Sequence, residues 1–442
     1  MASTVLSRTQ TNGTSSKIFT TSIWFKRSPV TNVGNQPLWS SSSSTGDALD
    51  LLIQGNGEIV FEDVNGNAPK FVTSRQLRDP SAFYNVVIAV DSTQAIDTNR
   101  VKIYLNGVQE TSFSTATYPT QNMDFAISTS ADTMKFGSGG QYNTLYFNGL
   151  MSYVAFVDGT AYTPTSFGEV NAASGIWKIN TAPSVTYGTN GCYLKMDTSS
   201  PGSDTSGNNN TFTAAGTPTL AQDNASNNLV TMNPLDNYYQ GSTFSNGNNT
   251  FLTTDVSTTY NTSSIMVNTG KWYAECKVVS GGAATNIGIA GEMADATTGI
   301  IEAKEFGYAY ASNGEFGNNG SASSYGSSYA NGDIIGIALD CTNNKLYFSK
   351  NGTFQDSGNP SAGSGGKTIT AAASTTLGLY AFAACDTSNG DIRTFSFNFG
   401  NGFFGTTAVA SSNADAAGHG LFEYAVPTGF FTINTKNLNT YG

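Results

Sequence analysis

Hydrophobic and polar side chains alternate along short stretches of this chain. In the stretch VKIYLNG, residues 101–107, every second residue is aliphatic, beginning with Val101. A period of two residues is that of a half-buried β-strand. The Asn106-Gly107 pair that follows accepts positive φ and is typical of a tight hairpin turn. We therefore predict a strand that ends in a turn.

A similar phrase returns in the second half of the chain. Residues 99–111 read NRVKIYLNGVQET, and residues 343–356 read NNKLYFSKNGTFQD. Both alternate, pass through an aromatic residue and end at Asn-Gly. The second phrase also closes a hairpin, because IIGIALDC, residues 334–341, precedes it across a Thr-Asn-Asn turn. We interpret the two phrases as equivalent elements of two different β-sandwiches.

Short strand patterns recur along most of the chain, whereas a helical period never lasts beyond a turn or two, apart from a weak hint near residues 166–175. Evenly spaced short strands with tight turns are typical of an all-β sandwich or barrel. The predicted strands are 18–27, 49–53, 57–63, 83–90, 101–108, 123–128, 133–137, 145–157, 250–256, 264–268, 271–279, 285–291, 306–311, 334–341, 345–350, 376–383 and 392–399.

The composition of the sequence becomes more polar after Trp177. Residues 197–211, DTSSPGSDTSGNNNT, contain almost no apolar side chain, and much of 214–228 is similar. One strand pattern, GCYLKM, comes just before them. We therefore predict a first domain over residues 1–179, a polar connecting region over 180–234 and a second domain over 235–442.

Charged residues are scarce. They make up 12% of the chain, about half of the roughly 25% usual in soluble domains. Asn, Ser, Thr and Gly therefore supply most of the polar surface, and these residues are poor in helix interiors. Aliphatic and aromatic residues recur evenly, which argues against disorder. Because few charges are available to protect exposed sheet edges, we expect the edges to be short or covered by neighbouring subunits, which indicates a homo-oligomer.

The net charge of −11 and the pI near 4.5 argue against binding to nucleic acid or to anionic membrane surfaces. No run of 18 apolar residues is present, so we predict no membrane insertion. The first residues, MASTVLSRTQTNGTSS, lack the apolar segment of a secretory signal.

The four cysteines form no CxxC pair, and we expect reduced thiols in a protein made in cytoplasm. They are Cys192, Cys276, Cys341 and Cys385.

Catalytic chemistry finds little support in the sequence. A histidine-dependent hydrolase needs a positioned base, and the one histidine, His419, lies in the loop-like stretch AAGHG. A glycosidase needs two carboxylates. Asp295, Glu302 and Glu305 form the acidic cluster to test for this, but a solvated loop is the simpler explanation, because acidic pairs are common in any sequence. We predict that the protein is not an enzyme.

A metal site is weakly indicated. Clusters of Cys and His, which a transition metal would need, are absent from the sequence. Calcium prefers oxygen ligands, and the densest group of these is Asp197, Asp204, Asn208 and Asn209. The alternative is a solvated linker. No cofactor is otherwise predicted.

Aromatic residues in loop-like stretches offer a second kind of site. Sugars are bound by flat aromatic rings next to amides and hydroxyls, and the loops of a rigid sandwich are its usual binding surface. The alternative is that these rings cap the ends of the sandwiches or pack against a neighbouring subunit. The candidate glycan- or partner-binding residues are Trp39 in NQPLWSSS, Tyr142 in GSGGQYNT, and Tyr325 and Tyr329 in SSYGSSYANG.

The start of the chain resembles a known family. Residues 4–28, TVLSRTQTNGTSSKIFTTSIWFKRS, combine an Arg-Thr element with a first core strand of the form S-x-W-x-K-R, from Ser22 to Arg27. This resembles laminin-G-like (concanavalin A-like) sandwich domains of tailed-phage proteins, as do VKIYLNGV and residues 146–170. Such domains often bind calcium, but the resemblance matches no calcium ligand here residue by residue.

The second half resembles a SPRY domain. The W-Y-x-E strand of that family is present at Trp272–Glu275, and its G-D-x-I-G…L-x-F-x-x-N-G hairpin spans Gly332–Gly352. The linker DTSGNNNTFT and the ending FNFGNGFF…PTGFFTINTKNLNTY also resemble phage proteins that join these two domains. An extra Gly/Ala/Ser segment at 405–420 departs from the pattern and leaves the contacts of the last strand open.

The resemblance implies two concanavalin A-like (jelly-roll) β-sandwiches in a bacteriophage virion protein. We expect a structural protein on the particle surface, a tail fibre or a capsid fibre or decoration protein, which contacts other virion proteins. Trimers are common among phage fibres. The alternative is a receptor-binding adhesin for host surface glycans, used in host attachment. A glycan depolymerase is a third and weaker reading.

Overall fold

The computed structural model describes residues 4–28, 34–43, 47–64, 69–140, 144–197, 200–237, 241–254, 258, 260–295, 299–388 and 390–442. The chain forms two compact units. Unit 1 comprises Met1–Leu220 and Asn224–Ser226, and unit 2 comprises Ala221–Asp223 and Asn227–Gly442. In the described part of the chain, no helix is long and apolar enough to cross a membrane.

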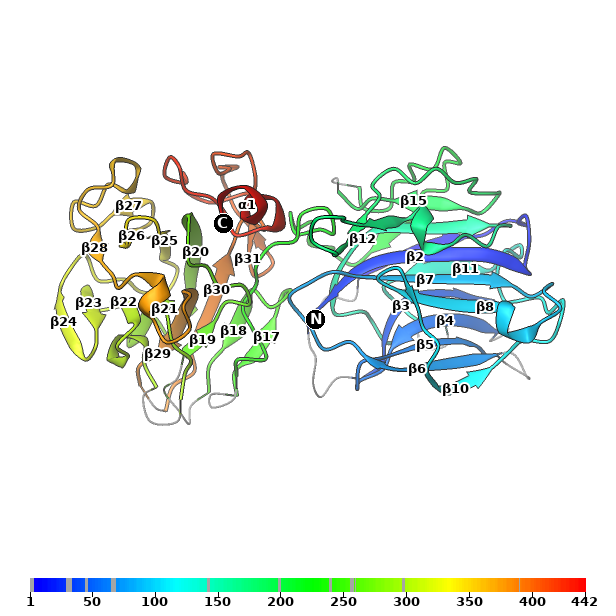
Figure 1. The fold of residues 1–442 in the computed structure, drawn as a ribbon, viewed down its shortest axis with the longest axis horizontal. Coiled ribbons are helices and arrows are strands. Elements are labelled where there is room, and N and C mark those ends of the chain that lie inside the picture. Colours follow the sequence, from blue (N-terminus) through cyan, green and yellow to red (C-terminus); the bar gives the residue numbers. More distant parts are fainter. Residues whose placement is uncertain are drawn as a thin grey trace. The chain divides into compact units, whose positions relative to one another are not determined.

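Unit 1 is a sandwich of two antiparallel sheets, seen as stacked layers in Figure 1. The eight-stranded sheet contains, in spatial order, β10 (Phe113–Thr117), β6 (Lys70–Gln76), β5 (Glu58–Asp63), β4 (Ala48–Ile53), β3 (Gln36–Ser42), β11 (Thr133–Phe136), β1 (Val5–Thr9) and β16 (Thr213–Ala215). The six-stranded sheet contains β15 (Cys192–Leu194), β12 (Gly149–Asp158), β2 (Ile18–Arg27), β7 (Tyr84–Asp91), β8 (Val101–Leu105) and β9 (Val108–Gln109).

The alternating pattern explains the core of unit 1. In β8 the aliphatic residues from Val101 to Leu105 are buried, while Lys102 and Tyr104 are half-exposed. The other face of this sheet is also covered, because Trp24 and Val87 pack against Phe167 and other residues that follow β12. The six-stranded sheet therefore has apolar contacts on both faces.

Residues predicted as the polar connecting region, 180–234, contribute strands to unit 1. Strand β15 pairs with β12, and β16 pairs with β1 at the edge of the larger sheet. The hint of a helix near 166–175 corresponds to a single 3-10 turn, Pro164–Ser166, and a small hairpin. The hairpin strands are β13 (Gly168–Val170) and β14 (Trp177–Ile179).

Unit 2 is a second sandwich. Its eight-stranded sheet contains β17 (Thr243–Ser245), β18 (Thr250–Leu252), β30 (Thr394–Asn398), β20 (Lys271–Ser280), β25 (Ile334–Asp340), β26 (Lys345–Lys350) and β27 (Thr353–Phe354), with β28 (Lys367–Thr368) also paired to β26. Its six-stranded sheet contains β19 (Tyr260–Thr262), β29 (Ala381–Asp386), β21 (Thr285–Ala290), β22 (Gly307–Ala311), β23 (Glu315–Asn318) and β24 (Ser321–Ser324). The predicted all-β fold of two sandwiches is confirmed.

Aromatic side chains fill the core of unit 2. Trp272, Tyr310 and Phe348 are fully buried between the two sheets. The four cysteines of the chain are buried thiols, and burial raises the pKa of Cys341 to about 12. Thiols in this state are poor nucleophiles, so they serve as small core side chains.

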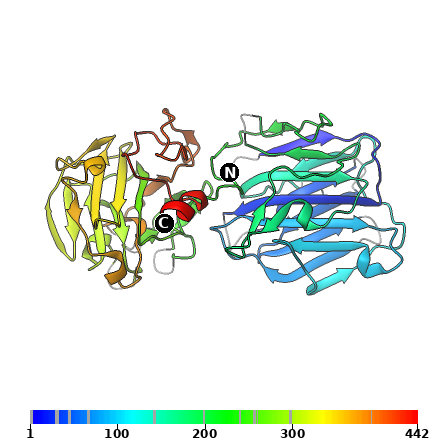
Figure 2. The same cartoon turned by 45° about the horizontal axis from the view of Figure 1, so that its top comes forward.

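The chain ends with a segment that covers the outer face of the eight-stranded sheet of unit 2. A small hairpin, β31 (Phe403–Phe404) and β32 (Thr407–Ala408), precedes it. The one α-helix among the described residues, α1 (Thr435–Tyr441, red in Figures 1 and 2), follows it and is capped by the side chain of Asn434. The remaining 3-10 turns are Asp97–Asn99, Ile301–Ala303, Pro360–Ala362 and Ala372–Ser374.

Candidate functional site

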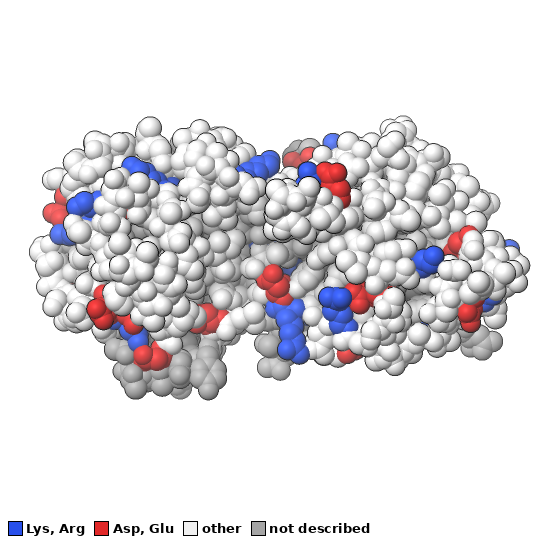
Figure 3. Space-filling view, in the orientation of Figure 1, with Lys and Arg blue, Asp and Glu red and all other residues white. Residues whose placement is uncertain are grey.

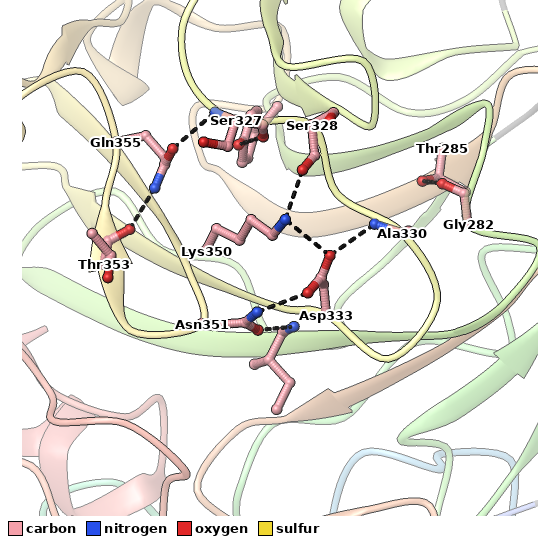
Figure 4. Close-up of polar contacts among 12 residues, drawn as sticks. Gly282, Thr285, Ser327, Ser328, Ala330, Asp333, Lys350, Asn351, Thr353 and Gln355 are labelled. Carbon is pink, nitrogen blue, oxygen red and sulfur yellow. Dashed lines mark hydrogen bonds and ion pairs between the residues drawn. The ribbon is translucent and has the colours of Figure 1, made fainter.

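Two neighbouring loops of unit 2 form a hydrogen-bonded surface (Figure 4), which we call the loop platform. It consists of residues 325–333, between β24 and β25, and residues 351–355, which include β27 and follow β26. The second loop begins with the Asn351-Gly352 turn, in which both residues have positive φ, 48° and 82°. Because β25 and β26 form one hairpin, the two loops lie at the same end of it.

Two buried tyrosines fix the first loop to the core of unit 2. The hydroxyl of Tyr325 accepts a hydrogen bond from Phe348 N–H at 3.0 Å. The hydroxyl of Tyr329 lies 2.9 Å from the carbonyl oxygens of both Thr285 and Tyr310. Their rings meet the Tyr310 ring edge-on at centroid distances of 5.3 and 5.1 Å. Both tyrosines are buried, so this loop is fixed to the core at two points.

An ion pair joins the two loops. Lys350 Nζ lies 3.2 Å from Asp333 Oδ2 and donates to Ser328 O at 2.7 Å. Asp333 also accepts hydrogen bonds from Ala330 N–H and Asn351 Nδ2. Partial burial raises the pKa of Asp333, but the hydrogen bonds and Lys350 outweigh it, and the net pKa is lowered. The carboxylate is therefore ionised and held in place near neutral pH.

A glutamine completes the connection. Gln355 Oε1 accepts from Ser327 N–H at 2.9 Å, and its Nε2 donates to Thr353 O at 2.7 Å. The loops approach closely at Gly326, where an added Cβ would lie 2.6 Å from Gln355 Oε1 and would displace this side chain. Each loop thus fixes the other.

The exposed residues of the platform are small and uncharged. They are Ser327, Ser328, Ala330, Asn331, Gly332, Asn351, Gly352 and Thr353. Hydroxyl, amide and backbone groups of this kind can donate and accept hydrogen bonds, but they supply no general base or nucleophile pair. The arrangement is suited to contact, and its fixed geometry reduces the entropy lost when a partner binds.

The aromatic residues predicted to bind sugars have different positions. Trp39 lies in β3, fully buried, with the rings of Phe19 and Phe156 at 6.3 and 5.9 Å. Tyr325 and Tyr329 are the buried anchors described above. Tyr142 lies outside the described residues. A buried ring offers no face to a sugar, so we do not carry Trp39, Tyr325 and Tyr329 forward as stacking residues.

The predicted oxygen cluster is used for local structure. Both carboxylate oxygens of Asp204 accept backbone N–H groups, including those of Tyr193 and Asn210. Asn208 Nδ2 donates to Gly188 O and Gly191 O. Asp197 and Asn209 are exposed. Among the described residues, no three His, Cys, Asp or Glu side chains are grouped so that they could hold a metal ion.

The predicted acidic cluster is also dispersed. Asp295 forms an ion pair with the buried Lys304 at 2.5 Å. Burial raises the pKa of Glu302, while Glu305 is exposed. An ion-paired aspartate and an exposed glutamate do not form an acid and base pair in a shared cleft, so we carry no catalytic role forward for these residues.

A polar row crosses the outer face of the larger sheet of unit 1 and was not anticipated from the sequence. Neighbouring strands place Asp50 opposite Glu62, with polar residues on either side. Asp50 is fully buried and accepts from Gly140 N–H at 2.7 Å, and Glu62 pairs with Lys70 at 2.7 Å. The complete row is Ser7, Lys135, Ser40, Asp50, Glu62, Lys70 and Thr117. Its centre is covered, and its carboxylates already have partners.

Comparison with protein families assigns both domains. Residues 3–165 match the model of the concanavalin A-like lectin/glucanases superfamily, and residues 271–400 match the SPRY domain. The predicted laminin-G-like and SPRY domains are therefore confirmed. No curated protein matches the chain.

Three solved structures are similar at low identity. The SPRY domain of human HERC1 is 16% identical, with 38% of this chain and 96% of that chain covered and a TM-score of 0.27. A native heptameric SAP-like pentraxin from Limulus polyphemus is 13% identical, with 36% and 71% covered and a TM-score of 0.27. Stonustoxin is 13% identical, with 38% and 27% covered and a TM-score of 0.29. These scores are too low to carry an argument about function.

Proposed function

From a concanavalin A-like domain and a SPRY domain on one chain, we propose that this protein is a non-enzymatic structural component on the surface of a bacteriophage particle. It would work as part of a tail fibre or a capsid decoration, through contacts with other virion proteins. The observation that carries the proposal is the loop platform, a hydrogen-bonded surface whose exposed residues are uncharged and offer no catalytic pair.

Two further observations support this function. The linker and the ending of the chain resemble phage proteins that join these two domains. On the face of the molecule shown in Figure 3, most of the surface belongs to uncharged residues. A surface of this kind can approach other subunits with little electrostatic repulsion and little desolvation of charge. It is therefore compatible with a protein that is packed at high density on a particle, as a homo-oligomer.

Immunogold labelling of purified particles tests the location. We expect gold on the tail or the capsid surface of intact particles. A protein found solely in the lysate, with unlabelled particles, would contradict the proposal. The same experiment decides between tail and capsid.

A matched pair of substitutions tests the platform. Ser328→Arg places a long charged side chain on the platform, and Ser130→Arg makes the same change on an exposed loop of unit 1. We expect Ser328→Arg to reduce incorporation into particles at least tenfold, whereas Ser130→Arg should leave it unchanged. Equal incorporation of both variants would exclude the platform as the contact surface.

The second candidate function is a receptor-binding adhesin for host glycans. It is favoured by the hydroxyl and amide groups of the platform and by the half-buried ring of Tyr424, which lies beside Gly352 of the same surface. A glycan array probed with the full chain distinguishes the two functions. Binding that Ser328→Arg abolishes would favour the adhesin, and an array without signal would count against it.

A further inference from the structure

The segment after β32 runs across the outer face of the eight-stranded sheet of unit 2. We call residues 413–430 the strap. Phe422 and Phe430 of the strap are fully buried against Tyr273 and Tyr347 of the sheet. The Phe422 ring meets the Tyr273 ring edge-on at 5.3 Å. The strap therefore closes a small apolar layer on the outside of the sandwich.

A buried carboxylate fastens the strap at its centre. Glu275, in the middle of β20, is fully buried and points to the outer face. Its Oε1 accepts from Tyr424 N–H at 2.8 Å, and its Oε2 accepts from Glu423 N–H at 3.0 Å. Asn398 Nδ2 supports the same arrangement, because it donates both to Glu275 Oε2 and to Leu421 O. One side chain thus holds two successive amides of the strap.

The next side chain reaches the loop platform. Tyr424 lies against Gly352, where a Cβ would come within 2.6 Å of the tyrosine Cδ1. Burial raises the pKa of the Tyr424 hydroxyl, and the negative charges of Glu423, Glu275 and Asp333 of the platform raise it further. Tyr424 is half-buried, so part of its ring remains at the surface. The ring therefore connects the fastening point at Glu275 with the turn that opens the second platform loop.

We propose that the strap sets the shape of the loop platform, with Glu275 as the positioning residue and Tyr424 as the side chain that both holds the Asn351-Gly352 turn and extends the contact surface. This inference deepens the proposed function and rests on it for the role of the platform. The extra segment at 405–420 of the sequence contains β32 and the first part of the strap, residues 413–420.

Hydrogen exchange on the full chain tests the coupling without any partner. The reporters are two backbone amides of the second loop. Asn351 N–H donates to Ile334 O, and Gln355 N–H donates to Phe348 O. In Tyr424→Ala we expect these amides to exchange at least tenfold faster, while Tyr424→Phe should stay within twofold of the natural chain. Asn106 N–H, which donates to Asn85 O in the corresponding turn of unit 1, is the internal control and should not change.

Glu275→Gln tests the positioning residue. Glutamine keeps one oxygen but places an amide where one strap N–H needs an acceptor, so exchange at Glu423 and Tyr424 should accelerate together with exchange at residues 351–355. Acceleration confined to the strap would overturn the proposal. So would unchanged exchange at 351–355 in Tyr424→Ala, which remains decisive if Glu275→Gln fails to fold. Because no partner is needed, this result is independent of particle incorporation, which tests the proposed function.

Discussion

The two sandwiches contain the same turn, and each covers it with an aromatic ring. In unit 1, Asn106 exchanges backbone and side-chain hydrogen bonds with Asn85, and the ring of Trp177 lies against Gly107. In unit 2, Asn351 bonds to Ile334 in the same way, and Tyr424 lies against Gly352. The similar phrases of the sequence thus fold into equivalent structures.

The two rings are held differently. Trp177 Nε1 donates to the neutral Asn85 Oδ1 at 3.1 Å. Tyr424 is held through its backbone by Glu275, an ionisable group that burial gives a pKa of about 7, against the opposing effect of its hydrogen bonds. The two equivalent turns are therefore held by a neutral amide in unit 1 and, through the backbone of Tyr424, by an ionisable carboxyl group in unit 2.

Loss of the buried carboxylate should have the largest effect. Glu275→Ala leaves the N–H groups of Glu423 and Tyr424 without their acceptor and removes one of the two hydrogen bonds of the Asn398 amide. Each buried donor that loses its acceptor costs about 1–3 kcal/mol, so we expect the two strap amides together to cost about 3–5 kcal/mol. Chemical denaturation followed by hydrogen exchange should show this loss in unit 2 alone. A loss below about 1 kcal/mol would contradict a fastening role for Glu275.

The stability of unit 2 should also fall as pH rises from about 5 to 8. The pKa of Glu275 in the folded protein, about 7, lies above its ordinary value of 4.5. Between these values the folded state binds more protons than the unfolded state, so the free energy of unfolding decreases with rising pH, by on the order of 3 kcal/mol.

Asp386 of the same unit, whose pKa burial raises to about 6, acts in the same direction. The contribution of Glu275 is therefore read as the difference between the natural chain and Glu275→Gln, measured by denaturation at several pH values. An equal pH dependence in the two proteins would show that Glu275 is not the titrating group. Trp177 and Asn85 do not ionise in this range, so the turn in unit 1 should not respond.

Glycine at the turn of unit 1 should be harder to replace than its equivalent in unit 2. Gly107→Ala combines a φ of +80° with a Cβ placed 2.5 Å from the hydrogen-bonded Trp177 ring, and we expect a loss of about 2–3 kcal/mol. Gly352→Ala meets the half-buried Tyr424, which can move outward, so about 1–2 kcal/mol is expected.

The control for both is Gly175→Ala, at φ +70° with no atom within 4 Å of the added Cβ. It carries the backbone strain alone, about 1 kcal/mol. Thermal or chemical denaturation of the three variants checks the order. Equal losses in the free energy of unfolding for Gly107→Ala and Gly175→Ala would mean that the Trp177 ring moves aside for the added Cβ at little cost.

The smallest expected losses of stability come from removing the polar group of each ring, the indole N–H of Trp177 and the hydroxyl of Tyr424. Trp177→Phe keeps a ring but removes the donor to the buried Asn85, at a cost of about 1 kcal/mol. Tyr424→Phe removes a hydroxyl that donates no hydrogen bond among the described residues, and it should leave stability unchanged. Denaturation of both variants provides the measurement, and a larger loss for Tyr424→Phe would reverse the comparison.

The sequence predicted those features that depend on alternation. The strand predicted over 101–108 is present as β8, which ends at Leu105 before the turn, and the hairpin between Ile334 and Lys350 is also present. The strand predicted at 123–128 is irregular instead. The turn at Gln121 and Asn122 comes just before it, and the apolar residues that follow form no strand pairing.

The site was less predictable, because side-chain direction in loops has no period. Nothing in SSYGSSYANG shows that Tyr325 and Tyr329 turn inward while the serines remain outside. The direction follows from acceptors that lie far away in the sequence, such as Thr285 O for Tyr329. The strap was hidden for the same reason, since its partner Glu275 is 148 residues away from Glu423.

The account rests on contact through the loop platform. Hydrogen exchange of the assembled particle, compared with the free protein, measures this directly. We expect residues 325–333 and 351–355 to be protected at least tenfold in the particle, with smaller changes on the exposed loops of unit 1. Equal exchange of the platform in the free and assembled protein would contradict the account.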